Sequence, residues 1–269
     1  MDLTQASVLG LVQGLTEYLP VSSSAHLVLV PQWLDWEFEP KQAFIFNVLV
    51  QLGTLLGVIV YFFKDLRAIA IAMIRDMISG SPFREPEARL GWMVVLATIP
   101  AAVVGLLWKS EISAFFASVR SVYGFLMVTA ALLAIAEACN RGVSSKIRWL
   151  DAGVMGLAQA FALLPGISRS GATIAAGVGL GLSKTEAARF SFFMSIPVML
   201  GASIVAAKDG VQDMGAFETM VGPILLGMLV AMTSGYLVIA WFMRFLQTKS
   251  LLWFSAYCGI VGISGLLFS

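Results

Sequence analysis

Two apolar segments of the chain are each interrupted by a proline and a cluster of small polar residues. The first, residues 3–30, is interrupted at residues 19–26, which read LPVSSSAH; the second, residues 149–182, is interrupted at residues 164–173, which read LPGISRSGAT. A helix needs about 20 consecutive apolar residues to cross a bilayer, and neither half of the first segment reaches that length. Irregular backbone is tolerated at membrane depth only where protein or a cavity surrounds it. A re-entrant helix pair is therefore predicted for each segment.

The rest of the chain predicts an all-α polytopic membrane protein that forms one integral membrane domain over residues 1–269. Hydrophobic residues make up 59% of the sequence and charged residues 12%, about half the charged fraction of a typical soluble domain. The net charge of +1 and the lack of a basic tail give no indication of a nucleic-acid partner. Six full spans are expected, at residues 44–63, 90–108, 121–138, 187–207, 221–243 and 251–268. The charged link between the first two is expected to contain an amphipathic helix over residues 66–78.

The two halves of the chain, residues 1–138 and 149–269, follow one plan. Each is predicted to contain a broken helix pair followed by three spans, and short stretches recur, such as GLVQ at residues 10–13 and GLAQ at residues 156–159. Three spans is an odd number, so the second half is expected to be inverted relative to the first. Inverted repeats with broken helices build binding sites near the middle of the membrane.

The placement of basic residues predicts the orientation. If residues 31–43 lie outside, the inside loops hold twelve of the seventeen lysines and arginines, which is the bias of the positive-inside rule. These loops are residues 64–89, 139–149, 183–189 and 244–250, and the four basic residues assigned to the outside are Lys41, Lys109, Arg120 and Lys208. Both termini are then expected outside, and the first broken pair enters the membrane from the outer face.

The clearest ionisable residues deep in the broken segments are Glu17, His26 and Arg169. Ionisable residues inside a membrane are costly and usually functional. A structural explanation also exists, in which Arg169 only neutralises Glu17 and His26 caps a helix.

The first broken segment contains a serine and a histidine that could act as nucleophile and base, and two side chains whose oxygens could bind a metal ion. Ser23 and His26 are three residues apart and share a helical face, and a hydroxyl needs a base to become reactive. Gln13 and Glu17 lie one turn apart, and their oxygens suit Mg²⁺ or Ca²⁺ better than zinc. Taken alone, the serine triplet is more simply explained as a helix N-cap.

The second broken segment is predicted to bind an anion. Its glycines, Gly166 and Gly171, allow backbone N–H groups to approach an anion, and a helix N-terminus follows them. Arg169 presents a planar fork that matches phosphate oxygens. Hydroxyl donors are provided by Ser168, Ser170 and Thr173. Helix packing through small residues is the alternative for the glycines and serines, but not for the arginine.

These two motifs closely resemble the bacterial undecaprenyl-diphosphatase family, also called bacitracin-resistance proteins, and the resemblance covers essentially the whole chain. It implies metal-dependent hydrolysis of a polyprenyl diphosphate, undecaprenyl diphosphate, to the monophosphate in the bacterial cytoplasmic membrane, which recycles the lipid carrier for cell-wall synthesis. It also implies an inverted repeat with two re-entrant pairs.

The resemblance implies roles for individual residues wherever this sequence matches one of the family's motifs. Gln13 and Glu17 match the acidic motif, although many members have Glu where this chain has Gln13. Ser23 and His26 match the catalytic turn, and Ser22 beside them is expected to bind the substrate phosphate. The phosphate-binding loop is matched by Gly166, Ser168, Arg169, Ser170, Gly171 and Thr173, and Gln51 resembles a recurrent polar position.

The mechanism expected from these residues begins with Arg169 and the metal holding the diphosphate, while Ser23, activated by His26, attacks the terminal phosphorus. His26 as the nucleophile, or as the base for a water molecule, is an equally open variant. A lipid-phosphate transporter or flippase using the same site is the main alternative function, because broken inverted repeats are typical of carriers. Isoprenoid chain length, oligomeric state and the preferred metal stay open.

Overall fold

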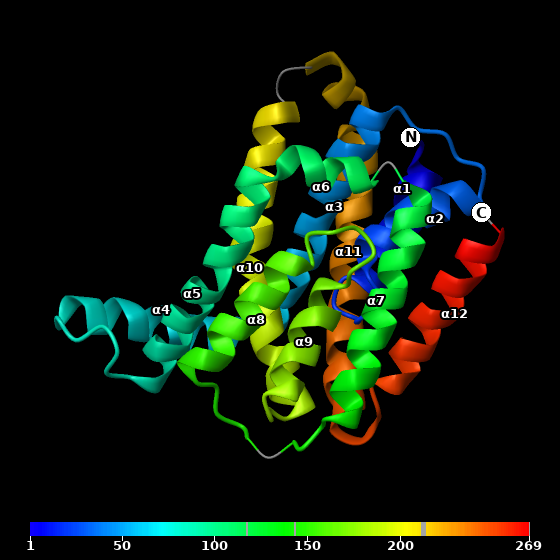
Figure 1. Ribbon diagram of the computed structural model, residues 1–269. Coiled ribbons are helices and arrows are strands. Elements are labelled where there is room, and N and C mark those ends of the chain that lie inside the picture. The colour runs from blue at the N-terminus through cyan, green and yellow to red at the C-terminus, as the bar shows by residue number, and fades with distance from the viewer. Residues whose placement is uncertain (117, 143, 211–213, 269) are drawn as a thin grey trace.

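The computed structural model describes residues 1–116, 118–142, 144–210 and 214–268, and all named elements within them are α-helices (Figure 1). Only the backbone is described for residues 40, 41, 113, 116, 206–210 and 214–219, so the side chains of Lys41 and Lys208 lie outside the described part. The helices are α1 Leu3–Thr16, α2 Ser23–Trp33, α3 Pro40–Tyr61, α4 Phe63–Ile78, α5 Pro86–Leu107, α6 Lys109–Phe116, α7 Val119–Ala138, α8 Trp149–Phe161, α9 Arg169–Gly179, α10 Lys184–Gly210, α11 Met214–Thr248 and α12 Leu252–Phe268.

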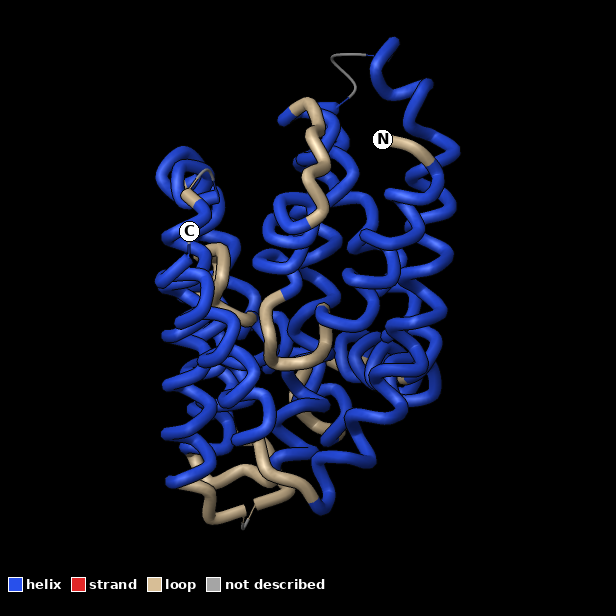
Figure 2. The backbone as a smooth tube through the Cα atoms, turned by 90° about the vertical axis from the view of Figure 1, so that its right-hand side faces the viewer, coloured by secondary structure: helices blue, strands red, loops and turns tan. Residues whose placement is uncertain are grey.

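Both predicted interruptions separate short helices. The first lies between α1 and α2, of 14 and 11 residues, and the second between α8 and α9, of 13 and 11 residues. A serine caps the helix that follows each break, because Ser22 Oγ accepts from the Ala25 N–H and Ser168 Oγ accepts from the Gly171 N–H. Figure 2 shows loop segments inside the bundle as well as at its ends. The sequence therefore located both breaks correctly.

Five helices of the described part are long and apolar enough to cross a membrane, in agreement with five of the six predicted spans. They include residues 42–61, 86–107, 119–138, 184–205 and 220–248. The sixth, α12, is apolar but has only 17 residues. At about 1.5 Å per residue it extends about 25 Å, less than the hydrocarbon core of about 30 Å. The structure therefore establishes a polytopic helical protein with five candidate spans.

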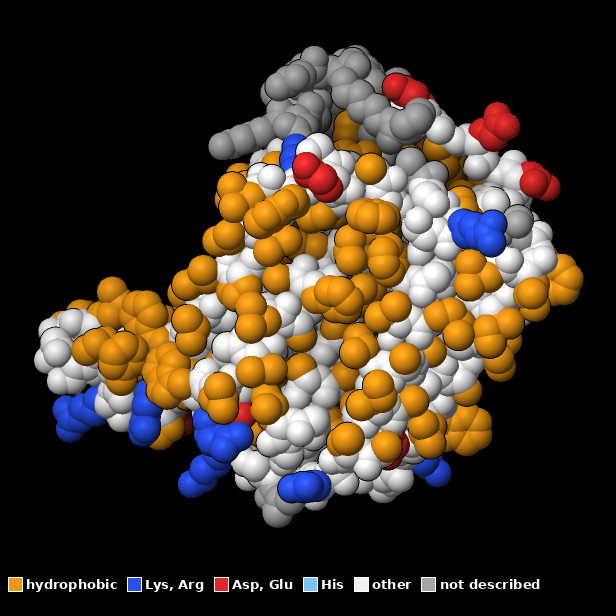
Figure 3. Space-filling model, in the orientation of Figure 1, with side chains coloured by type: hydrophobic (Ala, Val, Ile, Leu, Met, Phe, Trp, Pro, Cys, Tyr) orange, Lys and Arg blue, Asp and Glu red, His pale blue; other side chains and the backbone are white. Residues whose placement is uncertain are grey.

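The predicted amphipathic helix after the first span is confirmed as α4. It projects sideways from one end of the bundle in Figure 1, and apolar side chains such as Ile74 and Ile78 are exposed along it. On the face drawn in Figure 3, hydrophobic side chains cover the middle of the bundle and most Lys and Arg side chains gather at the end that carries α4. An apolar middle with basic residues at one end is the pattern of a membrane protein.

Small residues let the broken pairs pack deep in the bundle. Helix α1 packs on α11 where a Cβ at Gly10 would overlap the Gly227 backbone, and α8 packs on α5 where a Cβ at Gly156 would come within 2.8 Å of the Ala97 Cα atom. Helix α9 packs against α7, α8 and α10. This packing holds the two interruptions against each other in the interior, as their side-chain contacts show.

Candidate active site

Glu17 lies at the centre of the site, as the C-cap residue directly after α1, and only 7% of it is exposed. Its Oε1 atom forms an ion pair with Arg169 Nη2. Its Oε2 atom accepts hydrogen bonds from Ser23 Oγ at 2.6 Å and from Gln13 Nε2 at 2.7 Å. One carboxylate thus joins the hydroxyl of the first broken segment to the guanidinium of the second, and this brings together four residues predicted from the sequence.

Arg169 is the first residue of α9 and is held from several sides. Its guanidinium lies over the Tyr18 ring, 6.0 Å from the centroid, and Nη2 lies 3.5 Å from the sulfur of Met199. Its side chain is 16% exposed, so part of it is open to a ligand. A guanidinium fixed by packing loses little conformational freedom when it binds a phosphate.

The hydroxyl groups of the second break are buried and already bound to protein atoms. Ser170 Oγ donates to the Leu19 carbonyl at 2.9 Å, which ties the two broken segments together. Thr173 Oγ1 lies 2.6 Å from Ser191 Oγ, and Ser168 Oγ lies 3.1 Å from Ser170 Oγ. These groups therefore fix the loop, and direct contacts between them and a phosphate stay predictions.

The two glycine N–H groups that were expected to bind an anion are not both free to do so, because the Gly171 N–H already donates to a protein atom. The Gly171 N–H donates to Ser168 Oγ at 3.0 Å, and this bond caps α9. Gly166 has a φ of +105°, and a Cβ there would collide with the Val122 carbonyl and come within 2.7 Å of the Phe125 Cβ. Both glycines are thus explained by the local backbone and packing, and anion binding by the Gly171 amide stays a prediction.

Ser23 and His26 are not hydrogen-bonded to each other among the described residues, because both ring nitrogens of His26 bind elsewhere, and activation of Ser23 by His26 stays a prediction. Nδ1 lies 2.8 Å from the Ser22 carbonyl oxygen, and Nε2 lies 2.7 Å from the Tyr257 hydroxyl. Ser22 is the N-cap of α2 with a φ of +69°, and its carbonyl oxygen faces the imidazole. A spacing of three residues places two side chains on one helical face but does not fix their partners. The ionisable group in contact with Ser23 is the Glu17 carboxylate.

The predicted cation ligands form an oxygen-only set. Gln13 Nε2 donates to Glu17, which leaves Gln13 Oε1 buried without a hydrogen-bond partner among the described residues. The described residues contain no group of three His, Cys, Asp or Glu side chains that would hold a metal ion by themselves. One carboxylate and one unpartnered amide oxygen fit a hard cation that takes its other ligands from phosphate and water.

Gln51 does not reach this centre. Its amide donates to the Asn47 carbonyl of its own helix at 3.1 Å. One turn further along α3, the Thr54 hydroxyl lies 3.4 Å from Gln13 Nε2 and the Thr54 carbonyl accepts from the Tyr18 hydroxyl. The polar residue of α3 that supports the site is therefore Thr54.

Two further supporting residues carried no signal in the sequence. Thr129 Oγ1, from the middle of α7, donates to the Gly166 carbonyl and accepts from the Ser168 N–H, each at 2.9 Å. Tyr257, from α12, binds His26. Threonine and tyrosine in apolar helices are common, and only their position beside the broken segments marks these two.

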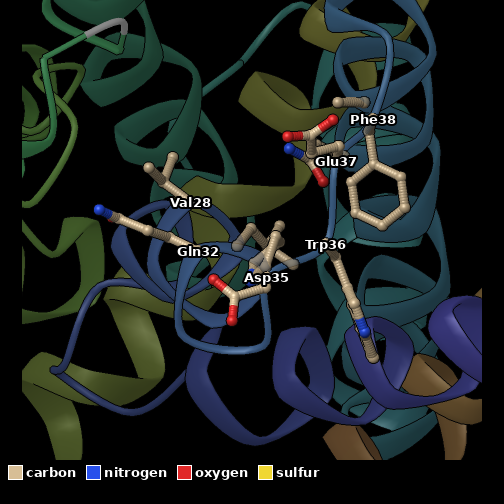
Figure 4. A pocket seen from close by; sticks show the side chains of 10 residues that line it. Val28, Gln32, Asp35, Trp36, Glu37 and Phe38 are labelled. Atoms are coloured by element: carbon tan, nitrogen blue, oxygen red, sulfur yellow. The ribbon is translucent and has the colours of Figure 1, made fainter.

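A separate cavity of about 460 Å³ lies along α2 and the loop that follows it (Figure 4). Carboxylates and amides share its wall with aromatic rings, and Gln32, Asp35 and Trp36 are among the side chains in the close-up. Its lining residues are Leu27, Val28, Pro31, Gln32, Asp35, Trp36, Glu37, Phe38, Ala43 and Asn47. The Glu17 centre is thus distinct from this cavity.

Fold and site together define a class, a polytopic helical membrane protein whose two broken helix pairs bury a carboxylate that contacts both a serine and an arginine. The model of the family "Bacitracin resistance protein BacA" matches residues 6–264, so the chain belongs to this family.

Individual relatives are similar in sequence to this chain over nearly its whole length. An undecaprenyl-diphosphatase of Methanobrevibacter smithii is 42% identical over 275 aligned positions, which cover 98% of this chain and 96% of the relative. An undecaprenyl-diphosphatase of Chlorobaculum parvum is 41% identical, and the alignment covers 98% of this chain and 96% of the relative. An undecaprenyl-diphosphatase of Myxococcus xanthus is 40% identical, and the alignment covers 98% of this chain and 88% of the relative.

Proposed function

We propose that this protein hydrolyses undecaprenyl diphosphate to undecaprenyl phosphate and inorganic phosphate in the membrane. The observation that carries the proposal is the Glu17 carboxylate, which contacts both the Ser23 hydroxyl and the Arg169 guanidinium. Family membership and the names of the relatives support the same reaction. A transporter needs a charge that complements phosphate, but it has no use for a carboxylate at 2.6 Å from a serine hydroxyl.

The first chemical step is attack by Ser23 Oγ on the terminal phosphorus. Glu17 Oε2 takes the hydroxyl proton as the O–P bond forms, because the short hydrogen bond already aligns donor and base. The bond from phosphorus to the bridging oxygen breaks, and undecaprenyl phosphate leaves with the proton that Glu17 returns. Arg169, at the N-terminus of α9, neutralises the charge on the transferring phosphoryl group.

The second step releases phosphate and regenerates the site. Water attacks the phosphoserine, Glu17 accepts a proton from that water, and the O–P bond to Ser23 breaks. The proton then returns to Ser23 Oγ, so that one water is consumed for each diphosphate. Two alternative routes give the same products. Direct attack by water forms no covalent intermediate, and attack by His26 forms a phosphohistidine in place of the phosphoserine.

We propose that a divalent cation, Mg²⁺ or Ca²⁺, assists this reaction. Glu17 and the unpartnered Gln13 Oε1 would hold it, together with phosphate oxygens. Such a cation supplies positive charge that offsets the charge of the diphosphate.

The proposed layout is an inverted repeat of residues 1–138 and 149–269. It is supported by matching packing, since α1 lies on α11 as α8 lies on α5. The N-terminus and the end of α12 point toward the same end of the bundle in Figure 1, and the basic side chains of Figure 3 gather at the other. With the basic end inside, the reaction occurs at the external face.

Phosphate release from the purified protein in detergent tests the proposed function. Wild type is expected to release phosphate from a polyprenyl diphosphate, with the rate lost on chelation and restored by Mg²⁺ or Ca²⁺. Ser23→Ala is expected to abolish release, whereas Ser24→Ala, its matched control at the next position, is expected to keep most of it. Absence of release by folded wild type would contradict the proposal.

Labelling tests the orientation. Ser23→Cys in a Cys139→Ser background removes the exposed native thiol and leaves Cys258, which is buried. Reaction of the new thiol with an impermeant reagent added outside intact cells is expected. Labelling only from the cytoplasmic side would reverse the assignment.

A further inference from the structure

The last helix of the chain, α12, is seated on the first broken segment. Cys258 Sγ lies 3.7 Å from the Pro20 carbonyl, and the preceding residue, Tyr257, places its hydroxyl 2.7 Å from His26 Nε2. The rings of Tyr257 and His26 are stacked, with an interplanar angle of 11° and centroids 5.7 Å apart. Ser255 Oγ donates to the Ala130 carbonyl at 2.7 Å and fixes α12 on α7.

These contacts select one form of the imidazole. The Ser22 carbonyl can only accept, so Nδ1, at 2.8 Å from it, carries the proton. Nε2 is then an acceptor in the neutral ring, and the Tyr257 hydroxyl is the donor that satisfies it. His26 is only 4% exposed, so a second partner at Nε2 is needed to avoid a buried unpaired nitrogen.

The same imidazole supports a strained turn. Ser22 has a φ of +69° and a ψ of +92°, which is uncommon for a residue with a side chain. Its carbonyl accepts both from His26 Nδ1 and from the His26 N–H at 3.3 Å. Ser23 follows directly, so the Ser22 backbone sets the direction from which Oγ reaches Glu17.

We infer that Tyr257 is a positioning residue of the active site, which holds His26 as the neutral Nδ1–H tautomer and thereby fixes the Ser22 turn that aims Ser23. This inference rests on the proposed function for its kinetic consequence only, because the hydrogen bond itself can be measured without substrate. It also gives His26 a role other than that of the base for Ser23.

The chain has a single histidine, so ring ¹⁵N spectra of uniformly His-labelled protein report on His26 alone. Wild type is expected to show a protonated Nδ1 and a hydrogen-bonded, unprotonated Nε2. In Tyr257→Phe the Nε2 signal is expected to move downfield toward that of a free acceptor. Tyr236→Phe is the matched control, since Tyr236 is 40% exposed against 42% for Tyr257 and its ring packs on Tyr61. It is expected to leave the spectrum unchanged.

The kinetic test compares the same two variants. Tyr257→Phe is expected to lower kcat about tenfold, the scale of one lost hydrogen bond, with KM unchanged. Tyr236→Phe is expected to retain wild-type kcat. Tyr257 is partly exposed, so loss of its hydroxyl leaves the apolar core intact, and equal thermal midpoints of the two variants check this.

Two results would overturn the inference. One is a wild-type spectrum with the proton on Nε2, which needs no variant to observe. The other is a Tyr257→Phe variant with an altered Nε2 signal but wild-type kcat, which would leave the tyrosine without a part in the reaction. Failure of wild type to release phosphate would instead contradict the proposed function, and the spectrum would still test the contact.

Discussion

Glu17 and Arg169, which are 152 positions apart in the sequence, form a largely buried ion pair at the junction of the two broken helix pairs. The pair cancels two charges that would each be costly inside a membrane. It also keeps the guanidinium beside the carboxylate that contacts Ser23, so a phosphate bound to Arg169 would lie next to the proposed nucleophile. The same contact therefore stabilises the site and aligns its reacting groups.

Removing the charge of Glu17 tests its role as the base. Glu17→Gln is expected to lower kcat by a factor of about 10²–10⁴, the usual contribution of a general base. It also leaves Arg169 without its counter-charge, and we expect a loss of about 3 kcal/mol in the free energy of unfolding. Phosphate release and unfolding in detergent measure the two effects. Wild-type kcat in this variant would exclude Glu17 as the base.

Arg169→Lys keeps the charge but loses the planar fork. We expect kcat/KM to fall about 100-fold, because a lysine cannot hold two phosphate oxygens in the same geometry. Arg189→Lys is the matched control, since Arg189 is also half-buried and paired with Asp65 and Glu186. It is expected to keep kcat/KM near the wild-type value. Equal losses in both variants would point to a general effect of arginine replacement.

Gln13→Glu tests the cation proposal. A second carboxylate beside Glu17 is expected to lower the Mg²⁺ or Ca²⁺ concentration needed for half-maximal activity. Without cation the two carboxylates repel each other, so the melting temperature in chelator is expected to fall below that of wild type. Cation titrations of activity and of melting temperature measure both effects. An unchanged cation dependence would place the ion away from these residues.

Gly166→Ala tests the support of the second break. The added Cβ would enter the space of the Val122 carbonyl at a φ of +105°, and we expect a loss of about 2 kcal/mol in stability together with lost activity. Gly179→Ala is the matched control, because nothing lies within 4 Å of a Cβ there. It is expected to be neutral in denaturant unfolding and in phosphate release. Similar losses in both variants would contradict the role of Gly166.

The sequence predicted the two interruptions, five of the helices long enough to span a membrane together with a sixth that is shorter than expected, and the meeting of Glu17, Ser23 and Arg169. These follow from hydropathy, from proline and from the cost of buried charge, which are properties of single segments. The partners of His26 did not follow, because one is the backbone carbonyl of Ser22 and the other lies on α12, 231 positions away in the sequence. Thr129 and Tyr257 were missed because their importance depends on which helices pack on the breaks.

The identity of the group that attacks phosphorus tests the central claim most directly. Rapid acid quenching of the purified protein during turnover of a polyprenyl diphosphate labelled at its terminal phosphorus, followed by peptide mapping, locates any covalent phosphate. Phosphoserine at Ser23 is the expected result, and it is expected to disappear in Ser23→Ala and to persist in Ser24→Ala. Phosphohistidine at His26 under milder quenching, or turnover by Ser23→Ala, would contradict the account.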